Sequence, residues 1–473
     1  MSEIYFSNFQ LEEDTEYFLY IGELKNYGLN AFLKEALTRI FSRKFDFIAI
    51  VPDIFEQYNY DNLIVINPYA ETFECQFGAH VCCRVSSEEF AAAVSNNRRI
   101  RALIKRLLNR QEHIYIYMFE SIPEMTLDEI PNVSILGPDK HIAKHINSKI
   151  YQYQHLKDML PVVDFRVCHN FEALLSSAQE LFPFWPDGLF VSGEYSAAGV
   201  NSIIAHDMDD IKNKFSAPDK PYLISRFIPH TYDPTVLAVV ADEDDVYIAG
   251  VADQRIEKGT RFTGSFFPSV LDETIIAKLV EYTRISGKWL AREGYRGIFG
   301  CDFLVDDQNS IRFLEINARK QGTTLEFCFT LEQSLSPGSP MLPELEFYAV
   351  TEGVFPVNTV ETISNPKNLH WGTFNYKIQD PVQTEGYIPQ SAQEREAFKK
   401  VAQGKLKKDF LILEHAGCDF VVAQGAFIAR IVALGHSPAD VEQGLKQGQK
   451  TIDLTIIKTK DPEIHHESRN AAK

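Results

Sequence analysis

One predicted β-hairpin, within residues 294–324, constrains the fold of this chain more than any other stretch. Two apolar runs rich in strand-forming residues, 298–305 and 311–316, flank the turn-type sequence Asp-Asp-Gln-Asn-Ser at 306–310. A loop over 307–310 sets the register of the two strands. Three pairs then face each other: Asp306 with Ile311, Leu304 with Phe313, and Asp302 with Glu315. Opposed side chains lie about 4.5–5.5 Å apart and like charges there are destabilising, so this register predicts a cation or a proton shared by two carboxyl groups.

Asn317 extends this predicted cluster. Side chains alternate along a strand, so Asn317 shares a face with Glu315. Asp302, Glu315 and Asn317 would then bring three oxygen-bearing side chains to one end of the hairpin. Hard oxygen ligands suit Mg²⁺, which usually binds one or two carboxylates together with substrate phosphates. The pattern predicts a magnesium site, and the alternative is an ordinary exposed hairpin with acidic ends.

The stretch D-F-L-V-D…F-L-E-I-N-A-R resembles the metal-binding hairpin of the ATP-grasp superfamily, in particular its carboxylate–amine ligases for peptides and amino acids. The resemblance implies that Asp302, Glu315 and Asn317 hold Mg²⁺, or Mn²⁺ in its place, against the phosphates of ATP. It also implies that Arg319 reaches the transferred phosphoryl group or the acyl phosphate.

The composition and the cysteine spacing are typical of a globular protein from a reducing compartment. The 473 residues suffice for about three domains. A net charge of −18 argues against nucleic acid or an anionic membrane as the main partner. The 7 cysteines show no C-x-x-C spacing, no signal peptide is recognisable, and no apolar run approaches the roughly 20 residues of a membrane span. We therefore expect a cytoplasmic protein with no membrane contact.

Alternating strand and helix patterns predict a mostly parallel α/β domain over 1–135, which the resemblance equates with a Rossmann-like pre-ATP-grasp domain. A two-part ATP-grasp fold is expected next, with an ATP-binding subdomain at 136–222 and a metal-binding subdomain at 223–335. A small α+β accessory region at 336–473 completes the chain. The sequence also predicts single helices over 86–110 and 139–160, and a strand at 347–355.

Several residues resemble the family's nucleotide-binding positions. Lys149, on the helix before Pro161, matches a lysine that contacts ATP phosphate, although it is also one of several lysines on that helix. Ser192 stands where the family has its second lysine. The loop S-A-A-G-V, with Ser196 and Gly199, matches a small-residue loop over the phosphates. The adenine contacts are expected at three positions of the hinge strand: Ser225, Arg226 and Ile228.

Three basic residues lie near the expected entrance of the site: Arg255, Lys258 and Arg261. They are candidates for binding an anionic substrate, and solvent-facing strand positions are the equal alternative.

The resemblance implies an ATP-dependent ligase. A carboxylate attacks the γ-phosphate to give an acyl phosphate, and an amine displaces phosphate to give an amide or peptide. Two alternatives stay open: a biotin-carboxylase-like enzyme that uses bicarbonate, and a nucleotide-binding protein without ligase turnover. The expected partners are small-molecule carboxylate and amine substrates. The oligomeric state is open, a homodimer included.

Overall fold

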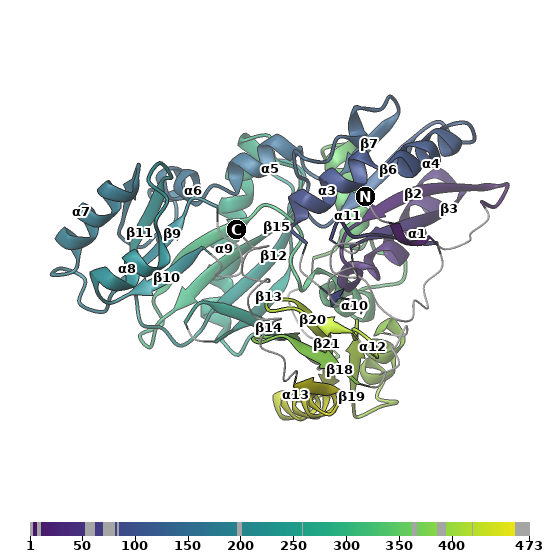
Figure 1. Ribbon diagram of the computed structural model, residues 1–473. Coiled ribbons are helices and arrows are strands. Elements are labelled where there is room, and N and C mark those ends of the chain that lie inside the picture. The colour runs from purple at the N-terminus through teal and green to yellow at the C-terminus, as the bar shows by residue number, and fades with distance from the viewer. Residues whose placement is uncertain are drawn as a thin grey trace.

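The structure is a computed structural model that describes residues 3–6, 11–52, 62–69, 81–82, 85–195, 201–257, 259–361, 367–385, 394–418 and 420–458. Four sheets organise it. Figure 1 shows an N-terminal α/β part at the right, a small lobe at the left, a long central sheet between them, and a C-terminal part below. No helix in these ranges is both long and apolar enough to cross a bilayer.

The N-terminal part is built on a six-stranded sheet. In spatial order its strands are β1 (Glu3–Phe6), β4 (Leu63–Ile66), β3 (Lys44–Val51), β2 (Thr15–Ile21), β6 (Ile114–Met118) and β7 (Val133–Leu136). All neighbouring pairs are parallel except β1 with β4. Helix α1 (Leu29–Phe41) packs on β3, while α3 (Ser87–Asn96) and α4 (Arg98–Leu108) pack on β4 and β6. Two short 3-10 turns accompany them: η1 (Leu24–Asn26) and η2 (Leu127–Glu129). The predicted parallel α/β arrangement is confirmed.

Two helices that the sequence predicted as continuous are each divided by a capping residue. Asn97 separates α3 from α4, because its extended backbone ends the first helix and its side chain accepts hydrogen bonds from the first turn of the second. Ser148 likewise separates α5 (Lys140–Ile146) from α6 (Lys149–Leu156), and its hydroxyl accepts from the amide of Tyr151. The prediction of single helices is therefore wrong, and the second break makes Lys149 the first residue of α6.

The small lobe, residues 165–226, is an antiparallel sheet with two helices. In spatial order its strands are β10 (Ser202–Ala205), β9 (Leu189–Gly193), β11 (Tyr222–Arg226) and β8 (Phe165–Cys168). Helices α7 (Phe171–Leu181) and α8 (Met208–Lys214) contact each other and close a separate hydrophobic core. The predicted domain boundary at residue 222 falls at the first residue of β11, which pairs with both β8 and β9.

The central sheet has eight strands. In spatial order they are β16 (Ile311–Asn317), β15 (Gly297–Val305), β12 (Pro234–Val240), β13 (Val246–Glu257), β14 (Arg261–Phe267), β17 (His370–Lys377), β21 (Phe427–Gly435) and β19 (Lys408–Leu413). Helix α9 (Glu273–Arg292) covers the β12, β13 and β15 end, and α13 (Pro438–Asp453) covers the β17, β19 and β21 end. The C-terminal strands thus extend the same sheet.

A fourth, small sheet joins distant parts of the chain. In spatial order it contains β22 (Ile456–Lys458), β18 (Val382–Thr384), β20 (Val421–Val422) and β5 (Val81–Cys82). Strand β5, from the N-terminal part, pairs in parallel with β20. Helices α10 (Thr324–Ser334) and α12 (Glu394–Ala402) pack together nearby.

Residues 342–351 form helix α11 (Leu342–Thr351), so the predicted strand at 347–355 is wrong. Pro343 stands in the first turn, where its missing N–H costs nothing, and the helix packs against α1 and β15. Its buried residues lie on nearly all sides, which hides the helical period in the sequence.

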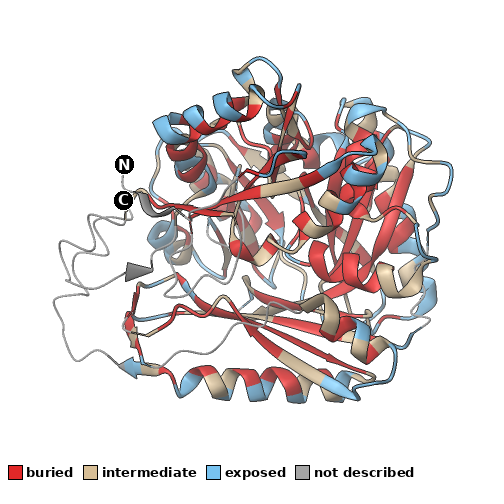
Figure 2. Cartoon of the chain, turned by 90° about the vertical axis from the view of Figure 1, so that its right-hand side faces the viewer, coloured by how far each residue is buried: buried red, intermediate tan, exposed pale blue. Residues whose placement is uncertain are grey.

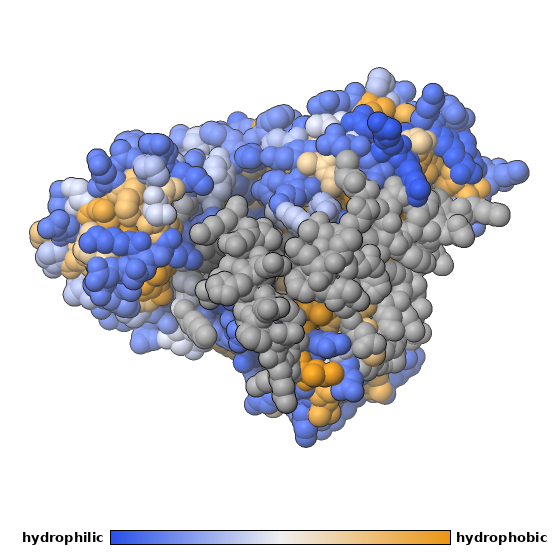
Figure 3. All heavy atoms as spheres, viewed as in Figure 1, coloured by the Kyte–Doolittle hydropathy of each residue, from blue (hydrophilic) through white to orange (hydrophobic). Residues whose placement is uncertain are grey.

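One core unites the N-terminal and C-terminal parts. The rings of Phe32 on α1 and Phe329 on α10 lie 5.6 Å apart, and Phe329 lies 4.9 Å from Phe398 on α12. In Figure 2 the residues coloured as buried gather on the strands and on the helices in the interior of the molecule. In Figure 3 the visible described surface is mainly hydrophilic, with hydrophobic patches on the small lobe and near the lower end.

Candidate functional site

The predicted hairpin is formed by β15 and β16, and a β-bulge sets its register. Asp302 faces Glu315 as predicted, but near the turn the pairs are Val305 with Ile311 and Leu304 with Arg312, one residue away from the predicted register. The register shifts between Asp302 and Phe303, where Leu314 is the extra residue on β16. Because of the shift, Leu314 and Glu315 both line the same cavity.

Asp302 is a buried carboxylate surrounded by neutral donors. The hydroxyl of Thr235 donates to Oδ1 at 2.6 Å and Nδ2 of Asn317 donates to Oδ2 at 2.9 Å. Nε2 of Gln321 lies 3.3 Å from Oδ1. Burial, followed by the charge of Glu315, raises the pKa of Asp302 to about 6 despite these hydrogen bonds. Because burial disfavours the ionised form of Asp302, a nearby cation would stabilise that form.

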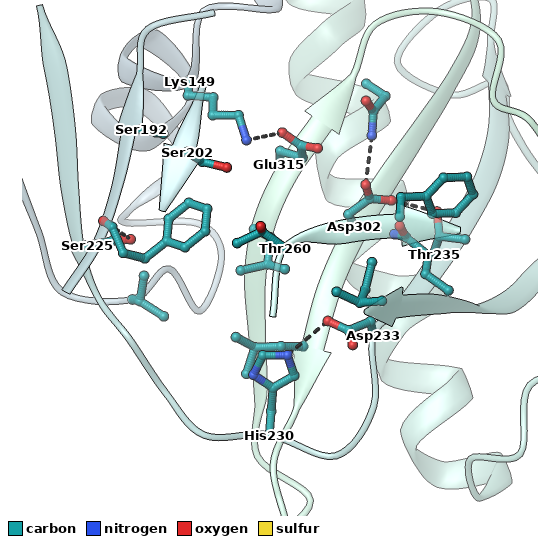
Figure 4. A pocket seen from close by; sticks show the side chains of 18 of the residues that line it. Lys149, Ser192, Ser202, Ser225, His230, Asp233, Thr235, Thr260, Asp302 and Glu315 are labelled. Carbon is teal, nitrogen blue, oxygen red and sulfur yellow. Dashed lines mark hydrogen bonds and ion pairs between the residues drawn. The ribbon is translucent and has the colours of Figure 1, made fainter. Parts of the chain in front are cut away.

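Glu315 forms an ion pair with Lys149, the first residue of α6. Figure 4 shows the two side chains meeting across the cavity, with Ser192 and Ser202 on the lysine's side and Asp302 on the other. Lys149 therefore lies in the cavity, and here it neutralises a carboxylate of the hairpin.

Arg319 lies just beyond β16 and also lines the cavity. Its Nε lies 3.6 Å from Oε2 of Glu120, and its guanidinium stands 5.5 Å from the centre of the Phe119 ring. Both partners follow strand β6 of the N-terminal sheet. Contacts with two residues of the N-terminal part thus hold the Arg319 side chain beside the hairpin.

The cavity, about 250 Å³ in volume, lies between the small lobe and the central sheet. The hairpin contributes Asp302, Leu304, Leu314, Glu315 and Asn317. The side facing the small lobe is lined by Phe190, Ser192, Ser202, Leu223, Ser225, Arg226, Phe227 and Ile228. Apolar and aromatic side chains with a few polar groups are typical of a small-molecule site.

The predicted nucleotide-binding residues fall into two groups. Ser192, Ser225, Arg226 and Ile228 line the cavity, whereas Ser196 and Gly199 lie outside the described residues. Ser192 is fully buried, and its hydroxyl has no hydrogen-bond partner among the described residues. Its role and that of the other positions stay predictions.

The predicted substrate-binding basic residues are placed differently. Arg255 and Arg261 both interact with Glu257 and neither lines the cavity, while Lys258 lies outside the described residues. The guanidinium of Arg255 also stands 5.8 Å from the centre of the Phe374 ring. Their binding of a substrate stays a prediction.

Other cavity residues were not singled out from the sequence. His230 and Asp233 form one pair: the ring nitrogens of His230 lie 2.7 Å from the carbonyl of Ile228 and 2.9 Å from Asp233. Burial opposes protonation of this histidine, but the two acceptors raise its pKa overall. Thr235, Gln254, Ser265, Gln321 and Thr323 also line the cavity. No local pattern marks these residues, because three different strands, the loop before β12 and the turn after β16 bring them together.

The residues present fit a divalent cation. Two carboxylates face each other, and within the described part of the chain a single lysine, Lys149, is in direct contact with them. Asn317 turns its nitrogen toward Asp302, so its carbonyl oxygen points away from that carboxylate. No group of three or more His, Cys, Asp or Glu side chains with metal-binding spacing occurs in the described ranges, so a cation here would use two carboxylates and an amide.

Comparison with known proteins adds an independent finding. Residues 188–323 match the family model of the ATP-grasp domain. The chain is 23% identical over 212 residues to [butirosin acyl-carrier protein]–L-glutamate ligase of Niallia circulans, an alignment covering 43% of this chain and 50% of that relative. The chain thus spans about half the length of this curated relative.

Solved structures share the fold over nearly the whole chain. The biotin carboxylase domain of the Hydrogenobacter thermophilus 2-oxoglutarate carboxylase, in complex with MgADP, ADP and bicarbonate, has a TM-score of 0.62 at 13% identity, covering 93% of this chain and 90% of that one. The Campylobacter jejuni biotin carboxylase has 0.59 at 14%, covering 94% and 92%. Carboxyaminoimidazole ribonucleotide synthase of Aspergillus clavatus, complexed with ATP, has 0.55 at 14%, covering 92% and 98%. At these identities the likeness establishes the fold.

Proposed function

We propose, from the ATP-grasp domain that this chain carries, that it is an ATP- and Mg²⁺-dependent ligase joining a carboxylate to an amine. One observation carries the proposal: the facing carboxylates of Asp302 and Glu315 and the guanidinium of Arg319 border the same cavity as the small lobe. Acidic oxygens for a cation and a guanidinium for phosphoryl oxygens are what phosphoryl transfer requires.

The reaction has two steps. A carboxylate oxygen of the acid attacks the γ-phosphorus of ATP, and the bond between the γ-phosphorus and the β,γ-bridging oxygen breaks. The products of this step are ADP and an acyl phosphate. The amine nitrogen then attacks the acyl carbon, the carbon–oxygen bond to phosphate breaks, and the proton lost by nitrogen leaves with phosphate. Arg319 binds the phosphoryl oxygens, and Lys149 holds Glu315 in place on the opposite wall.

Asp302, Glu315 and Asn317 would hold Mg²⁺, or Mn²⁺ in its place. When bound, such a cation neutralises charge on the phosphate oxygens. Ser192, Ser225, Arg226 and Ile228 would hold the nucleotide, with the loop of Ser196 and Gly199 over its phosphates.

The remaining inferences are coarser. The four predicted segments stay a proposal: the first sheet supports the N-terminal segment and the second sheet supports the small lobe, with the boundary of the lobe moved past β11 to about residue 227, whereas the eight-stranded sheet continues across the boundary at 335. The name of the curated relative contains L-glutamate, so L-glutamate is the first compound to test, both as the acid and as the amine. A cytoplasmic location and a homodimer stay predictions.

A second candidate function is a bicarbonate-using carboxylation, in which bicarbonate takes the place of the acid. The fold shared with biotin carboxylases, one of them holding bicarbonate, favours this candidate. Nucleotide binding without turnover is the third candidate, and Ser192 at the position of a phosphate lysine favours it.

The test is an assay of ADP release with ATP, Mg²⁺, hydroxylamine and a panel of amino acids, small acids and bicarbonate. We expect one acid to give ADP together with its hydroxamate, because hydroxylamine traps an acyl phosphate. Arg319→Ala and Asp302→Asn should each lower the rate by at least about 100-fold, since both groups act on transition-state charge.

Arg292→Ala is the matched control, because Arg292 pairs with Glu243 on the surface and should retain the parent rate. AMP and pyrophosphate as products would contradict the acyl-phosphate route. ADP release with bicarbonate alone would favour the second candidate, and no ADP release with any acid would favour the third.

A further inference from the structure

Glu120, the second residue after β6, connects the N-terminal part to the end of the hairpin. Its Oε2 lies 3.6 Å from Nε of Arg319, and its Oε1 accepts a hydrogen bond from Nδ2 of Asn147 at 3.0 Å. Asn147 is the residue that follows helix α5. Each carboxylate oxygen of Glu120 thus has a partner from a different element, although Glu120 itself does not line the cavity.

Asn147 joins Glu120 to the backbone next to Arg319. The Oδ1 atom of Asn147 accepts a hydrogen bond from the N–H of Ala318 at 2.9 Å, while its Nδ2 donates to Glu120. A backbone N–H only donates, so the amide oxygen must face Ala318 and the amide nitrogen must face Glu120. The carboxylate of Glu120 is therefore held on the side away from Arg319 as well.

The planar guanidinium of Arg319 is fixed by contacts at two of its nitrogens. Nε faces Glu120, and Nη1 donates to the carbonyl of Lys320 at 3.2 Å. Nη2 makes no hydrogen bond within the described part of the chain. Because the three nitrogens lie in one plane, the two contacts also fix the direction of the third. Arg319 lines the cavity and its side chain is 20% exposed, so its guanidinium is accessible.

The charges of Glu120 and Arg319 also depend on each other. Burial raises the pKa of Glu120, and the positive charge of Arg319 is the largest influence in the opposite direction. Glu120 is the only acidic side chain that pairs with Arg319 within the described part of the chain. A guanidinium with a single neighbouring carboxylate turns toward that carboxylate.

The ion pair of Glu120 with Arg319 is not needed to hold the N-terminal part against the hairpin. The buried pair of Lys320 with Glu346 and a hydrogen bond from the N–H of Lys320 to the carbonyl of Phe119 already make this connection. A partly exposed ion pair adds little to stability. The main effect of Glu120 is therefore on the direction of the Arg319 side chain.

We propose that Glu120 is a positioning residue for Arg319. The inference rests on the proposed ligase function, in which Arg319 binds the phosphoryl oxygens. Glu120 holds Nε from the N-terminal part, so the remaining N–H groups keep one direction while charge develops on the phosphoryl group. Glu120 acts through Arg319 and has no contact with a substrate, so it affects the rate of phosphoryl transfer and leaves the binding of ATP unchanged.

The test compares Glu120→Gln with the parent, using the acid that supports ADP release in the parent. Glutamine has the same length and can still accept from Asn147, but it removes the negative charge beside Arg319. We expect kcat for ADP formation to fall about tenfold, while the Kd for MgATP from calorimetry and the KM for the acid stay within about twofold. Glu129→Gln, at an exposed position of the same part, is the matched control and should keep the parent kcat.

A double-mutant cycle separates positioning from an independent role of Glu120. On the Arg319→Ala background, Glu120→Gln should lower the rate by less than about twofold in single turnovers with enzyme in excess, because the group that it positions is gone. A second tenfold loss on that background would overturn the proposal. A parent kcat in Glu120→Gln, or a raised KM for the acid, would do the same and leave the ligase proposal intact.

Glu120→Asp answers the question if Glu120→Gln does not fold. Aspartate keeps the charge at a shorter reach, so we expect kcat to fall about threefold, and only while Arg319 is present. The same loss on the Arg319→Ala background would contradict positioning. Absence of acid-dependent ADP formation in the parent would remove both proposals.

Discussion

The carboxylate of Asp302 and the imidazole of His415 show how burial changes the chemistry of a single side chain. Around Asp302, three neutral donors and an opposing carboxylate leave a group that is ready for a cation. His415 is also fully buried, but its surroundings hold it neutral. Nδ1 accepts from the amide of Gly417 at 3.0 Å, and Nε2 lies 2.9 Å from the hydroxyl of Thr455.

His415 provides a prediction for the pH dependence of stability. Burial lowers the pKa of His415 to about 4, below the usual 6.5. The unfolded chain then binds one more proton than the folded chain between these values, so its contribution to stability is present above about pH 6.5 and is lost as pH falls toward 4. In urea unfolding, His415→Asn should be about 1–2 kcal/mol less stable than the parent at pH 7.5.

The difference between parent and variant should shrink as the pH is lowered to about 4.5. A constant difference across that range would contradict a neutral His415 in the folded protein.

At the scale of elements, the pairing of β14 with β17 joins two groups of strands into one eight-stranded sheet. The strands pair at Phe266 with Gly372 and at Phe267 with Trp371. Gly264 lies so close to β17 that a Cβ would stand 1.9 Å from the carbonyl oxygen of Thr373. Glycine is required at this position because the neighbour is backbone, which cannot move aside as a flexible side chain can.

Gly264→Ala should therefore destabilise the protein by about 1–3 kcal/mol, through the overpacking of a close strand pair. Chemical denaturation followed by circular dichroism gives the value. Gly322→Ala is the matched control for stability, because a Cβ there meets nothing within 4 Å. Equal midpoints for the two variants would show that β14 and β17 are not held this closely.

At the scale of the whole molecule, a buried ion pair joins three parts of the chain. Lys320 follows the hairpin, and its Nζ lies 2.7 Å from Oε2 of Glu346 on α11. The same ammonium stands 4.2 Å from the centre of the Tyr117 ring on β6. Burial lowers the pKa of Lys320 and raises that of Glu346, so each charge depends on the other.

Replacing one partner of this ion pair should lower the free energy of unfolding more than replacing both. Lys320→Met should lower the free energy of unfolding by about 3–5 kcal/mol, because Glu346 is left buried without a counter-charge. Lys320→Met combined with Glu346→Gln should recover more than half of that loss. A double-mutant cycle measured by urea unfolding checks this, and strictly additive effects would contradict a direct coupling.

The sequence by itself determined what depends on local pattern. Two apolar runs rich in strand-forming residues, with the turn sequence Asp-Asp-Gln-Asn-Ser between them, predicted the hairpin, and strands separated by helices predicted the parallel N-terminal sheet. The sequence also predicted that Asp302 faces Glu315, and this pair is found, although it depends on a bulge that the sequence did not predict. The sequence also placed the start of a helix at residue 86, where the structure has a capping box formed by Ser86 and Glu89.

Only the tertiary structure decided the features that depend on packing between distant segments. Near the turn, the two strands pair one residue away from the register that places Asp302 opposite Glu315, and the bulge at Leu314 restores that pair. Phe313 and Ile316, on either side of the bulge, are both buried in the same hydrophobic core, which stabilises the bulged strand. Lys149 meets Glu315 because the first helix ends at Asn147 and Ser148 starts the next one. Helix α11 is buried on nearly all sides and so shows no period in the sequence. Gln321 faces Asp302 only because Gly300 has no side chain, a contact between separate elements that no local pattern records.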